Sequence, residues 1–353
     1  MLAEMVDHVV GVDPDRERVT AVLLDAKTKA ELDEVSFPTT PAGYAALIDW
    51  ADSESVPEAR VWSIEGAGSY GAGLCATLQA AGEWVLEFDH PDTRAAKDGA
   101  KSDGLDAARA AREVLGRTKL TQPRARGTRE GIRALLVARR GAKVARVAAI
   151  NALKALVVTA PVALREQLRD FTTIGLVHAC RRMRLGDGLD DETAGTKAAL
   201  RHLARRIDAL DGELAAIDRQ LKTLVTATAP QLLDEYGVGP VTAAQFLVSW
   251  SHGGRCRNEG AFARLAGVAP ITANSGQTQD RHRLNRGGDR HLNNALHTVV
   301  LTRARDHQPS RDYIARRITE GKTPREARRC LKRYVARHLF RLLEHPPGAL
   351  DET

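Results

Sequence analysis

The fold is decided near the amino end, in the stretch HVVGVDPDRERVTAVLLDAKTKAELDEVSF at residues 8–37. Its apolar residues fall into three runs, 8–14, 18–26 and 31–37, each of which has the pattern of a β-strand. Only short polar segments join these runs. Because connections this short pair strands antiparallel, we expect a three-stranded meander.

Helices and strands alternate after the meander. We expect a helix, a strand, a helix, a strand and a helix at 42–52, 61–65, 70–82, 84–88 and 105–115. Strands that are separated by helices add to a sheet in parallel. The resulting α/β order resembles that of RNase H-like nuclease domains.

The rest of the chain is expected to be all-α. A long helix is predicted at 129–158, and a shorter one includes Leu164 to Leu168. A later helix carries an apolar stripe with coiled-coil spacing: Leu200, Leu203, Ile207, Leu210, Leu214, Ile217, Leu221 and Leu224. Two interpretations of this stripe are open, a hairpin packed on the long upstream helix and a coiled coil that dimerises. Thr323-Pro324-Arg325-Glu326 has the pattern of a capping box and begins the last helix.

The charge of the chain favours a polyanionic partner. Of its 353 residues, 52 are Lys or Arg and 45 are Asp or Glu, which gives a net charge of +7. Residues 1–60 are net acidic, whereas the segment from Arg281 onward is strongly basic. A solvated charged surface is the alternative, but a basic half beside an acidic half is common in proteins that bind nucleic acids.

Cysteine spacing and hydropathy indicate a cytoplasmic protein. Its four cysteines lie far apart, which excludes a CxxC-type zinc site and is typical of thiols in a reducing compartment: Cys75, Cys180, Cys256 and Cys330. We find no signal peptide and no apolar run of membrane-spanning length, so no membrane partner is expected. The family resemblance described below implies that the protein acts at the bacterial nucleoid.

Four carboxylates are candidates for a metal site. Asp13 ends the first strand and Glu65 ends the strand at 61–65, and the carboxyl ends of strands face the functional crevice of an α/β sheet. Asp103 and Asp106 begin a helix and share one of its faces. Four clustered carboxylates repel one another unless a cation such as Mg²⁺ or Mn²⁺ lies among them. Taken singly, each could instead cap a turn or a helix.

The segment Gly66-Ala67-Gly68-Ser69-Tyr70-Gly71 formally matches the dinucleotide-binding pattern GxGxxG. That motif normally follows the first strand of its unit, and here three strands precede it. We expect these glycines to let the chain turn tightly beside Glu65.

Two loop motifs in the C-terminal part are candidates for phosphate contact. YGVGPVTAA (236–244) resembles a helix-hairpin-helix, whose Gly-x-Gly N–H groups bind phosphate; a plain helical turn is the alternative. Ser275-Gly276 lies in a polar loop followed by several arginines. Guanidinium groups stabilise charge on phosphorus, so Ser275 is a candidate nucleophile, although a serine in such a loop is more often a turn residue.

Six motifs together carry a resemblance to a known family. They are GVDP (11–14), SIEGAGSYGAGL (63–74), KSDGLDAARAA (101–111), GVGPVTAAQFL (237–247), LAGVAPITANSGQ (265–277) and HRLNRGGDRHLNNALH (282–297). In this order they resemble the DEDD-type transposases of the insertion-sequence 110 family, which are bridge-RNA-guided recombinases.

The resemblance implies a domain organisation. A RuvC-like nuclease domain would occupy 1–120, and a helical linker with a coiled coil would occupy 121–228. A mainly helical transposase domain with the helix-hairpin-helix-like motif would follow at 229–345, before a tail at 346–353.

The resemblance also implies a DNA transposase or site-specific recombinase with a shared active site. Asp13, Glu65, Asp103 and Asp106 would be catalytic and hold Mg²⁺ (or Mn²⁺), and Ser275 would join covalently to a DNA strand. Acids of one protomer would act beside the serine of another, which implies a homodimer or homotetramer and favours intermolecular pairing of the heptads. The partners would be donor and target DNA and a structured guide RNA. Residues expected to contact nucleic acid are Lys101, Gly237, Gly239, Arg281, Arg283, Arg286 and Arg290.

Two other functions compete with this one. A RuvC-like junction-resolving nuclease would use the same metal site with water as the nucleophile. A catalytically inactive nucleic-acid-binding protein would bind without cleaving.

Overall fold

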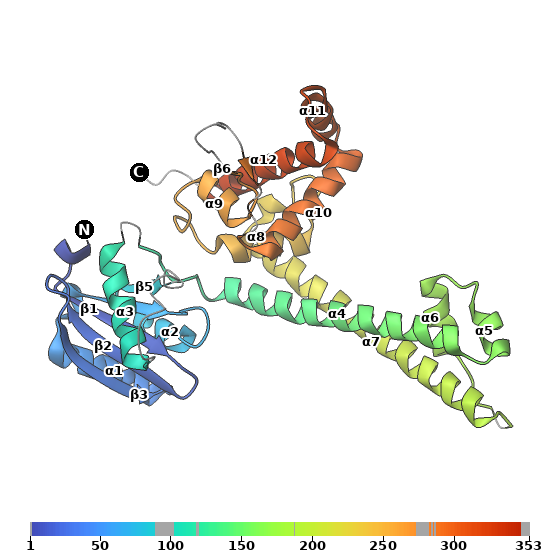
Figure 1. Cartoon of the computed structure of the whole chain (residues 1–353), viewed down its shortest axis with the longest axis horizontal. Helices are drawn as coiled ribbons and strands as arrows, with labels where there is room; N and C mark the ends of the chain where they lie inside the picture. Colours follow the sequence, from blue (N-terminus) through green and yellow to red (C-terminus); the bar gives the residue numbers. More distant parts are fainter. Residues whose placement is uncertain are drawn as a thin grey trace. The chain divides into compact units, whose positions relative to one another are not determined.

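The computed structural model describes residues 2–88, 102–117, 120–186, 188–272, 282–283, 285 and 287–346. The chain forms two compact units, Met1–Arg126 and Gly127–Thr353. The first is mixed α/β, and the second is mostly helical (Figure 1). Every helix among the described residues is too short or too polar to span a lipid bilayer.

The first unit is built on a five-stranded sheet with the order β3-β2-β1-β4-β5. Strands β1 (His8–Pro14), β2 (Arg18–Asp25) and β3 (Glu31–Pro38) pair antiparallel, which confirms the predicted meander. Strands β4 (Arg60–Glu65) and β5 (Val85–Phe88) extend the sheet in parallel from β1. The α/β order expected from the sequence is therefore present.

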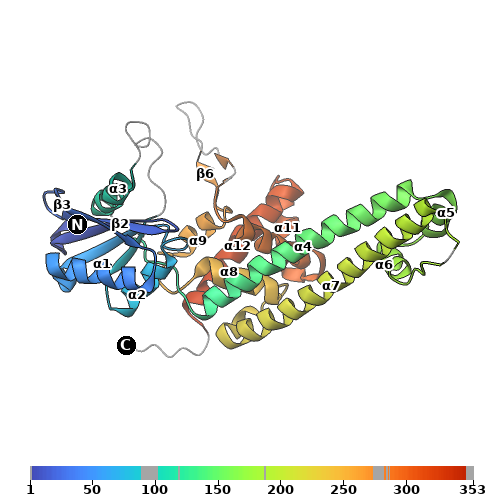
Figure 2. The ribbon, with the colours of Figure 1, turned by 90° about the horizontal axis from the view of Figure 1, so that it is seen from below.

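Helices cover both faces of this sheet. On one face, α1 (Pro41–Glu54) and α2 (Ala72–Ala80) pack on a core that contains Val10, Trp62 and Ile64. On the other face, α3 (Asp103–Gly116) packs through its alanines on residues that include Val9 and Val22 (Figure 2). Short 3-10 turns at Leu2–Glu4 and Pro57–Ala59 complete the unit.

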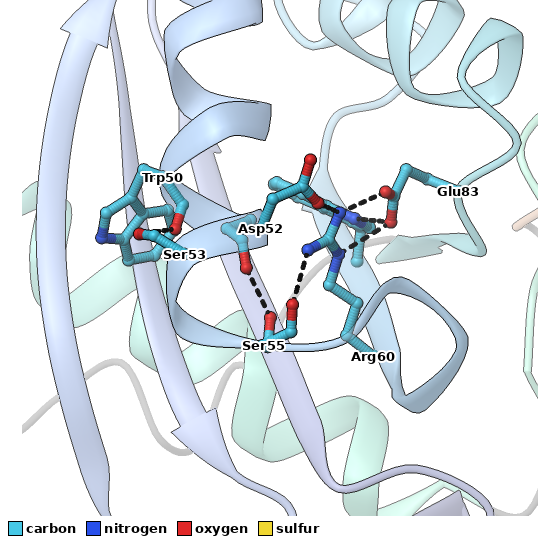
Figure 3. A network of polar contacts seen from close by, with 8 residues as sticks. Trp50, Asp52, Ser53, Ser55, Arg60 and Glu83 are labelled. Atoms are coloured by element: carbon cyan, nitrogen blue, oxygen red, sulfur yellow. Dashed lines mark hydrogen bonds and ion pairs between the residues drawn. The ribbon is translucent and has the colours of Figure 1, made fainter.

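A buried arginine fixes the start of β4. The side chain of Arg60 is fully covered, and its Nη2 donates to Asp52 Oδ1 at 2.6 Å while its Nε donates to Glu83 Oε2 at 2.9 Å (Figure 3). Its Nη1 also donates to the carbonyl of Ser55 at 3.2 Å. Trp62 Nε1 donates to the same Glu83 carboxylate at 2.6 Å. This network ties the end of α1 to β4 and to the entrance of β5, and so anchors the strand whose other end carries Glu65.

A long pair of antiparallel helices begins the second unit. Helices α4 (Thr128–Thr159) and α7 (Asp191–Thr228) lie side by side and are joined by ion pairs of Arg139 with Asp218 at 2.6 Å and of Arg146 with Asp211 (Figure 2). The short helices α5 (Val162–Leu168) and α6 (Thr173–Arg181) fold against one end of the pair and share a core with it.

The apolar stripe of α7 is partly covered within the chain. Leu200, Ile207, Ile217 and Leu221 are buried, whereas Leu203, Leu210, Leu214 and Leu224 are half-buried. Packing on α4 within the chain, one of the two interpretations of the stripe, therefore occurs. The outward face of α4 exposes four valines, Val137, Val144, Val147 and Val158. Dimerisation through this helix pair stays a prediction.

The remaining helices form another core with the amino end of α4 and the carboxyl end of α7. They are α8 (Pro240–Trp250), α9 (Glu259–Leu265), α10 (Arg290–Asp306), α11 (Gln308–Thr319) and α12 (Pro324–Glu344), preceded by a 3-10 turn at Pro230–Leu232. A short antiparallel ribbon of β6 (Ile271–Thr272) and β7 (His282–Arg283) stands between α9 and α10. The capping box predicted at Thr323 and Glu326 is confirmed.

Candidate nuclease face and serine loop

Asp13 and Glu65 lie at corresponding positions on neighbouring parallel strands. The register of β1 and β4 pairs Gly11 with Ser63 and Val12 with Ile64, and the two acids come next on each strand. Side chains alternate between the faces of a strand, so both acids share the face that Gly11 and Ser63 present to α3. Both side chains are half-buried. The sheet therefore brings together the first two of the four predicted carboxylates.

Gly11 lets α3 approach β1 closely. A Cβ at this position would lie 2.0 Å from the carbonyl oxygen of Ala107 and 2.7 Å from Cβ of Ala111. Ser63 on β4 holds the same helix, because its hydroxyl donates to the carbonyl of Ala110 at 2.8 Å. Gly11 belongs to the GVDP motif, and the motif itself indicates no role for it. Only the contact with α3 explains why a side chain is excluded there.

Asp103 and Asp106 occupy the first turn of α3. Ser102 caps the helix by accepting a hydrogen bond from the N–H of Leu105 at 3.3 Å. Carboxylates near a helix amino end are stabilised by the helix dipole. Asp103 is exposed, whereas Asp106 is half-buried and pairs with Arg109 Nη1 at 2.5 Å. The positions of both acids in the first turn of α3 are compatible with the expectation that they share one face of the helix. The ion pair with Arg109 neutralises part of the charge of Asp106.

The electrostatics of Asp13 link all four acids. Burial raises the pKa of Asp13, and the charges of Glu65, Asp106, Asp103 and Asp15 raise it further, to about 6. A carboxyl group beside other carboxylates resists ionisation in this way. Among the residues that the structure describes, no three Asp, Glu, His or Cys side chains already stand close enough to hold a metal ion. The four acids therefore share a neighbourhood without forming a preassembled ligand cluster.

The glycine-rich loop after Glu65 turns as expected. Gly66 has a φ of 61°, which favours glycine, and its carbonyl accepts a hydrogen bond from the N–H of Ser69 at 2.8 Å. At Gly71, a Cβ would lie 2.8 Å from Ile64 and 3.0 Å from Pro14. The loop consequently packs against the ends of both strands that carry the first two acids.

The predicted serine nucleophile lies outside the described residues, as do Lys101, Arg281 and Arg286. The described segments that flank this loop in the sequence contact each other. The N–H of Asp289 donates to the carbonyl of Leu265 at 2.7 Å, and a Cβ at Gly267 would lie 2.7 Å from the carbonyl of Gly287. Two glycine-containing segments, one after α9 and one before α10, are thus pressed together.

The remaining predicted nucleic-acid contacts lie on the second unit. Arg283 in β7 and Arg290 at the start of α10 are both exposed. Gly237 has a φ of 81°, and the N–H of Gly239 donates to Thr242 Oγ1 at 2.9 Å. The N–H of Val238 donates to the carbonyl of Glu235 at 3.0 Å. Two N–H groups of the Gly-x-Gly turn are thus engaged within the chain, and phosphate binding by this turn stays a prediction.

A polar network that sequence reasoning missed supports this turn. Arg303 is buried, and it donates to the carbonyl of Tyr236 at 2.8 Å and to the Glu235 carboxylate at 2.7 Å. His338 contacts the same carboxylate at 2.7 Å. Burial acts to raise the pKa of Glu235, but the hydrogen bonds from His338 and Arg303 outweigh it and lower the pKa. No local sequence pattern signals this network, because its members come from three separate segments.

Comparison with known proteins covers both units. Residues 10–160 match a family model described as a transposase, of the DEDD type of IS110, and residues 230–315 match the transposase IS116/IS110/IS902 family. An IS110 insertion element protein of 43.6 kDa from Streptomyces coelicolor is 31% identical over 165 residues, which are 44% of this chain and 41% of that protein. An IS116 insertion element protein of 44.8 kDa from Streptomyces clavuligerus is 27% identical over 161 residues, or 44% of this chain and 40% of that protein.

The similarity thus spans about two fifths of the length of each of these relatives. The two family models, in contrast, match separate parts of the chain in both units, and they agree with the relatives on one group of insertion elements. On these matches, the chain belongs to the IS110/IS116/IS902 family of transposases.

Proposed function

We propose that this protein is a DNA transposase that cuts and rejoins DNA strands, with the carboxylates of the first unit as its metal-binding acids. The observation that carries the proposal is the raised pKa of Asp13, to which the charges of Glu65, Asp106 and Asp103 all contribute. An acid with a raised pKa that lies among other carboxylates at the end of a strand is typical of a functional site. Membership of a transposase family agrees with this assignment.

The strand order supports an RNase H-like, RuvC-like fold for the first unit. An antiparallel meander continues through β1 into parallel strands, and a helix covers the face that carries the acids. In this arrangement β1 supplies Asp13, β4 supplies Glu65 and α3 supplies the other two acids. Each of these three elements therefore contributes at least one acid to the proposed site.

The four acids fit a hard divalent cation such as Mg²⁺ or Mn²⁺. Their donors are all carboxylate oxygens, and their mutual repulsion would be relieved by a positive ion. When bound, such a cation activates the attacking oxygen and stabilises the leaving oxygen of a phosphodiester. The chain itself positions the donors. Gly11 lets α3 approach the sheet closely, and the ion pair with Arg109 holds the side chain of Asp106.

Ser275 is proposed as the nucleophile that joins the protein to a DNA strand. Its hydroxyl oxygen would attack phosphorus, form a phosphoserine ester and release the 3′ or 5′ oxygen of the cut strand. The exposed arginines that follow it in the sequence, Arg283 and Arg290, are suited to contact the phosphate backbone.

A structured guide RNA and self-association complete the proposal. Both rest on the family resemblance, and the net charge of +7 agrees with binding to RNA as well as DNA. A homodimer or homotetramer would let the acids of one protomer act beside the serine of another. The exposed valines on the outward face of α4 support pairing with a second copy.

The test is a cleavage assay with the full chain, labelled DNA from the flanks of its gene, RNA transcribed from those flanks, and Mg²⁺. The wild-type protein is expected to cut the DNA and to form a covalent adduct. Asp13→Ala should abolish cutting, whereas Ser275→Ala should abolish the adduct. Asp15→Asn, an exposed neighbour of the site, serves as the control and should retain both.

Each result separates the candidate functions. Cleavage that persists in Asp13→Ala would refute the role of the acids. Cleavage without any adduct in the wild-type protein would indicate water as the nucleophile and a junction-resolving nuclease. Binding without cleavage under either Mg²⁺ or Mn²⁺ would indicate an inactive nucleic-acid-binding protein.

A further inference from the structure

The first turns of α12 carry an unusual concentration of positive charge. Between Pro324 and Arg333 the helix contains five cations, Arg325, Arg328, Arg329, Lys332 and Arg333. Its one acid there, Glu326, is engaged in capping, because its carboxylate accepts from the N–H of Thr323 at 2.9 Å. Like charges three and four residues apart on a helix repel one another. The helix therefore keeps a repulsion that a bound anion would relieve.

Lys332 is the innermost member of this group. It is half-buried, and its Nζ donates to Asn293 Oδ1 on α10 at 2.7 Å. Burial lowers the pKa of Lys332, and the charge of Arg329 lowers it further. A partly buried ammonium that is bonded to a neutral amide has lost hydration without gaining a counter-charge. Structural stability alone does not favour such an arrangement.

The pKa of His297 reflects the positive charge around Lys332. Burial lowers the pKa of His297 on α10, and the charges of Lys332 and Arg328 lower it further. In the described part of the chain, no ion pair joins Arg328, Arg329 or Lys332 to a carboxylate. A cluster of cations that lacks an internal counter-ion is suited to an external anion.

The cluster is linked to the segments that flank the serine loop in the sequence. Asn293, which accepts from Lys332, donates through Nδ2 to the carbonyl of Ala266 at 2.8 Å. Ala266 precedes Gly267, the residue pressed against Gly287. Helices α10 and α12 pack together there (Figure 1). Described residues that precede and follow Ser275 in the sequence, Ala266 and Asn293, are therefore linked to the cations of α12.

We propose that Arg325, Arg328 and Lys332 form a phosphate-binding track for the backbone of the DNA strand that enters the serine loop. These residues are three and four apart, so they lie on one face of α12 over about 10 Å. Asn293 is a positioning residue that orients the Lys332 ammonium. The choice of DNA as the occupant rests on the proposed function, whereas the phosphate chemistry does not.

The test measures binding of a fluorescein-labelled DNA duplex to the full chain over a range of salt concentrations. Loss of one phosphate contact should reduce the slope of log K against log salt by about 0.9, so Lys332→Met should weaken binding about five- to tenfold near 0.1 M salt. The triple change Arg325→Gln, Arg328→Gln and Lys332→Met should reduce the slope by about two to three. Lys332→Arg should restore most of the affinity.

A charge-matched control removes three exposed cations of α7 by the changes Arg205→Gln, Arg206→Gln and Lys222→Gln. An equal loss of slope in this control, or an unchanged slope in the α12 triple variant, would overturn the proposal. Lys332→Met should keep or raise the melting temperature, because it removes a half-buried ammonium. If it unfolds the protein, the double change Arg325→Gln and Arg328→Gln decides the question through its own slope.

Two further arms separate this proposal from the proposed function. A labelled RNA strand of the same sequence replaces the DNA in a parallel titration, and a loss of slope confined to RNA would overturn the assignment to DNA. The cleavage assay is run on the same variants. Wild-type protein that binds DNA with a slope dependent on α12 but never cuts it would refute the transposase activity and leave the track in place.

Discussion

Asp13→Asn should stabilise the metal-free protein at neutral pH. The folded state raises the pKa of Asp13 from 3.8 to about 6, with burial as the largest cause and Glu65 as the next. A shift of about two units corresponds to about 3 kcal/mol at 1.36 kcal/mol per unit. Because the side chain is only half-buried, solvent screening reduces this to about 1–2 kcal/mol. Asn keeps the shape of Asp without the charge.

The sign of the effect follows from proton linkage. The folded state binds the Asp13 proton more tightly than the unfolded state, so the stability linked to it is present below about pH 4 and is lost as pH rises through about 6. Asn has no proton that titrates in this range, so the variant does not lose this stability as the pH rises. Relative to the wild-type protein, Asp13→Asn should therefore gain stability at neutral pH and gain almost nothing at pH 4.

Differential scanning calorimetry of the full chain in metal-free buffer measures the difference. At about pH 7.5 the first unit should melt roughly 3–8 °C higher in Asp13→Asn than in the wild-type protein, and at about pH 4 the two should agree within about 1 °C. Mg²⁺ should raise the melting temperature of the wild-type protein more than that of the variant. Asp15→Asn is the matched control and should give a much smaller gain, because Asp15 makes the smallest of the charge contributions to Asp13. A variant no more stable than the wild-type protein at pH 7.5, or an equal gain at pH 4, would refute the reasoning.

Three further outcomes are expected. Arg60→Ala should lower the free energy of unfolding of the first unit by about 3–5 kcal/mol in a urea titration, since it leaves the Glu83 carboxylate buried without its counter-charge; a loss below about 1 kcal/mol would contradict this. Gly11→Val should push α3 off β1, because even a Cβ would lie 2.0 Å from the Ala107 carbonyl, and should abolish DNA cleavage. A variant that cuts at the wild-type rate would show that close packing there is dispensable. Val144→Glu, on the outward face of α4 where the valine is 71% exposed, should shift the protein toward monomer in analytical ultracentrifugation without unfolding it. An unchanged sedimentation coefficient would exclude this face from self-association.

Local patterns predicted the first unit closely. Alternating apolar runs and short connections gave the meander, and β1 begins and ends at the expected residues, His8 and Pro14. Capping chemistry predicted the start of α12 at Thr323 for the same reason: its determinants lie within four neighbouring residues. Strand ends also located Asp13 and Glu65 correctly at one edge of the sheet.

Features that depend on contacts between distant segments could not be predicted from the sequence. The need for glycine at position 11 comes from the position at which α3 packs on the sheet, and nothing in GVDP indicates it. The bond between Lys332 and Asn293 joins two helices through their tertiary packing. The heptad stripe of α7 was ambiguous because a seam between two helices has one pattern whether the partner is α4 or another chain. The four carboxylates could be placed together, but the raised pKa of Asp13 required their spatial arrangement.

The paired helices α4 and α7 also fix the distance between the two hydrophobic cores of the second unit. Helix α4 has 32 residues and is therefore about 48 Å long, which equals the rise of about 14 base pairs of B-DNA. Its ends are embedded in two separate cores, so the distance between them is set by chain length and not by a flexible linker. Removing seven residues from each helix would shorten this distance by about 10 Å, or the rise of about three base pairs. Because seven residues make nearly two full turns, almost the same faces of α4 and α7 would still pack against each other. The distance between the two cores would thereby change in steps of two turns of the α-helix.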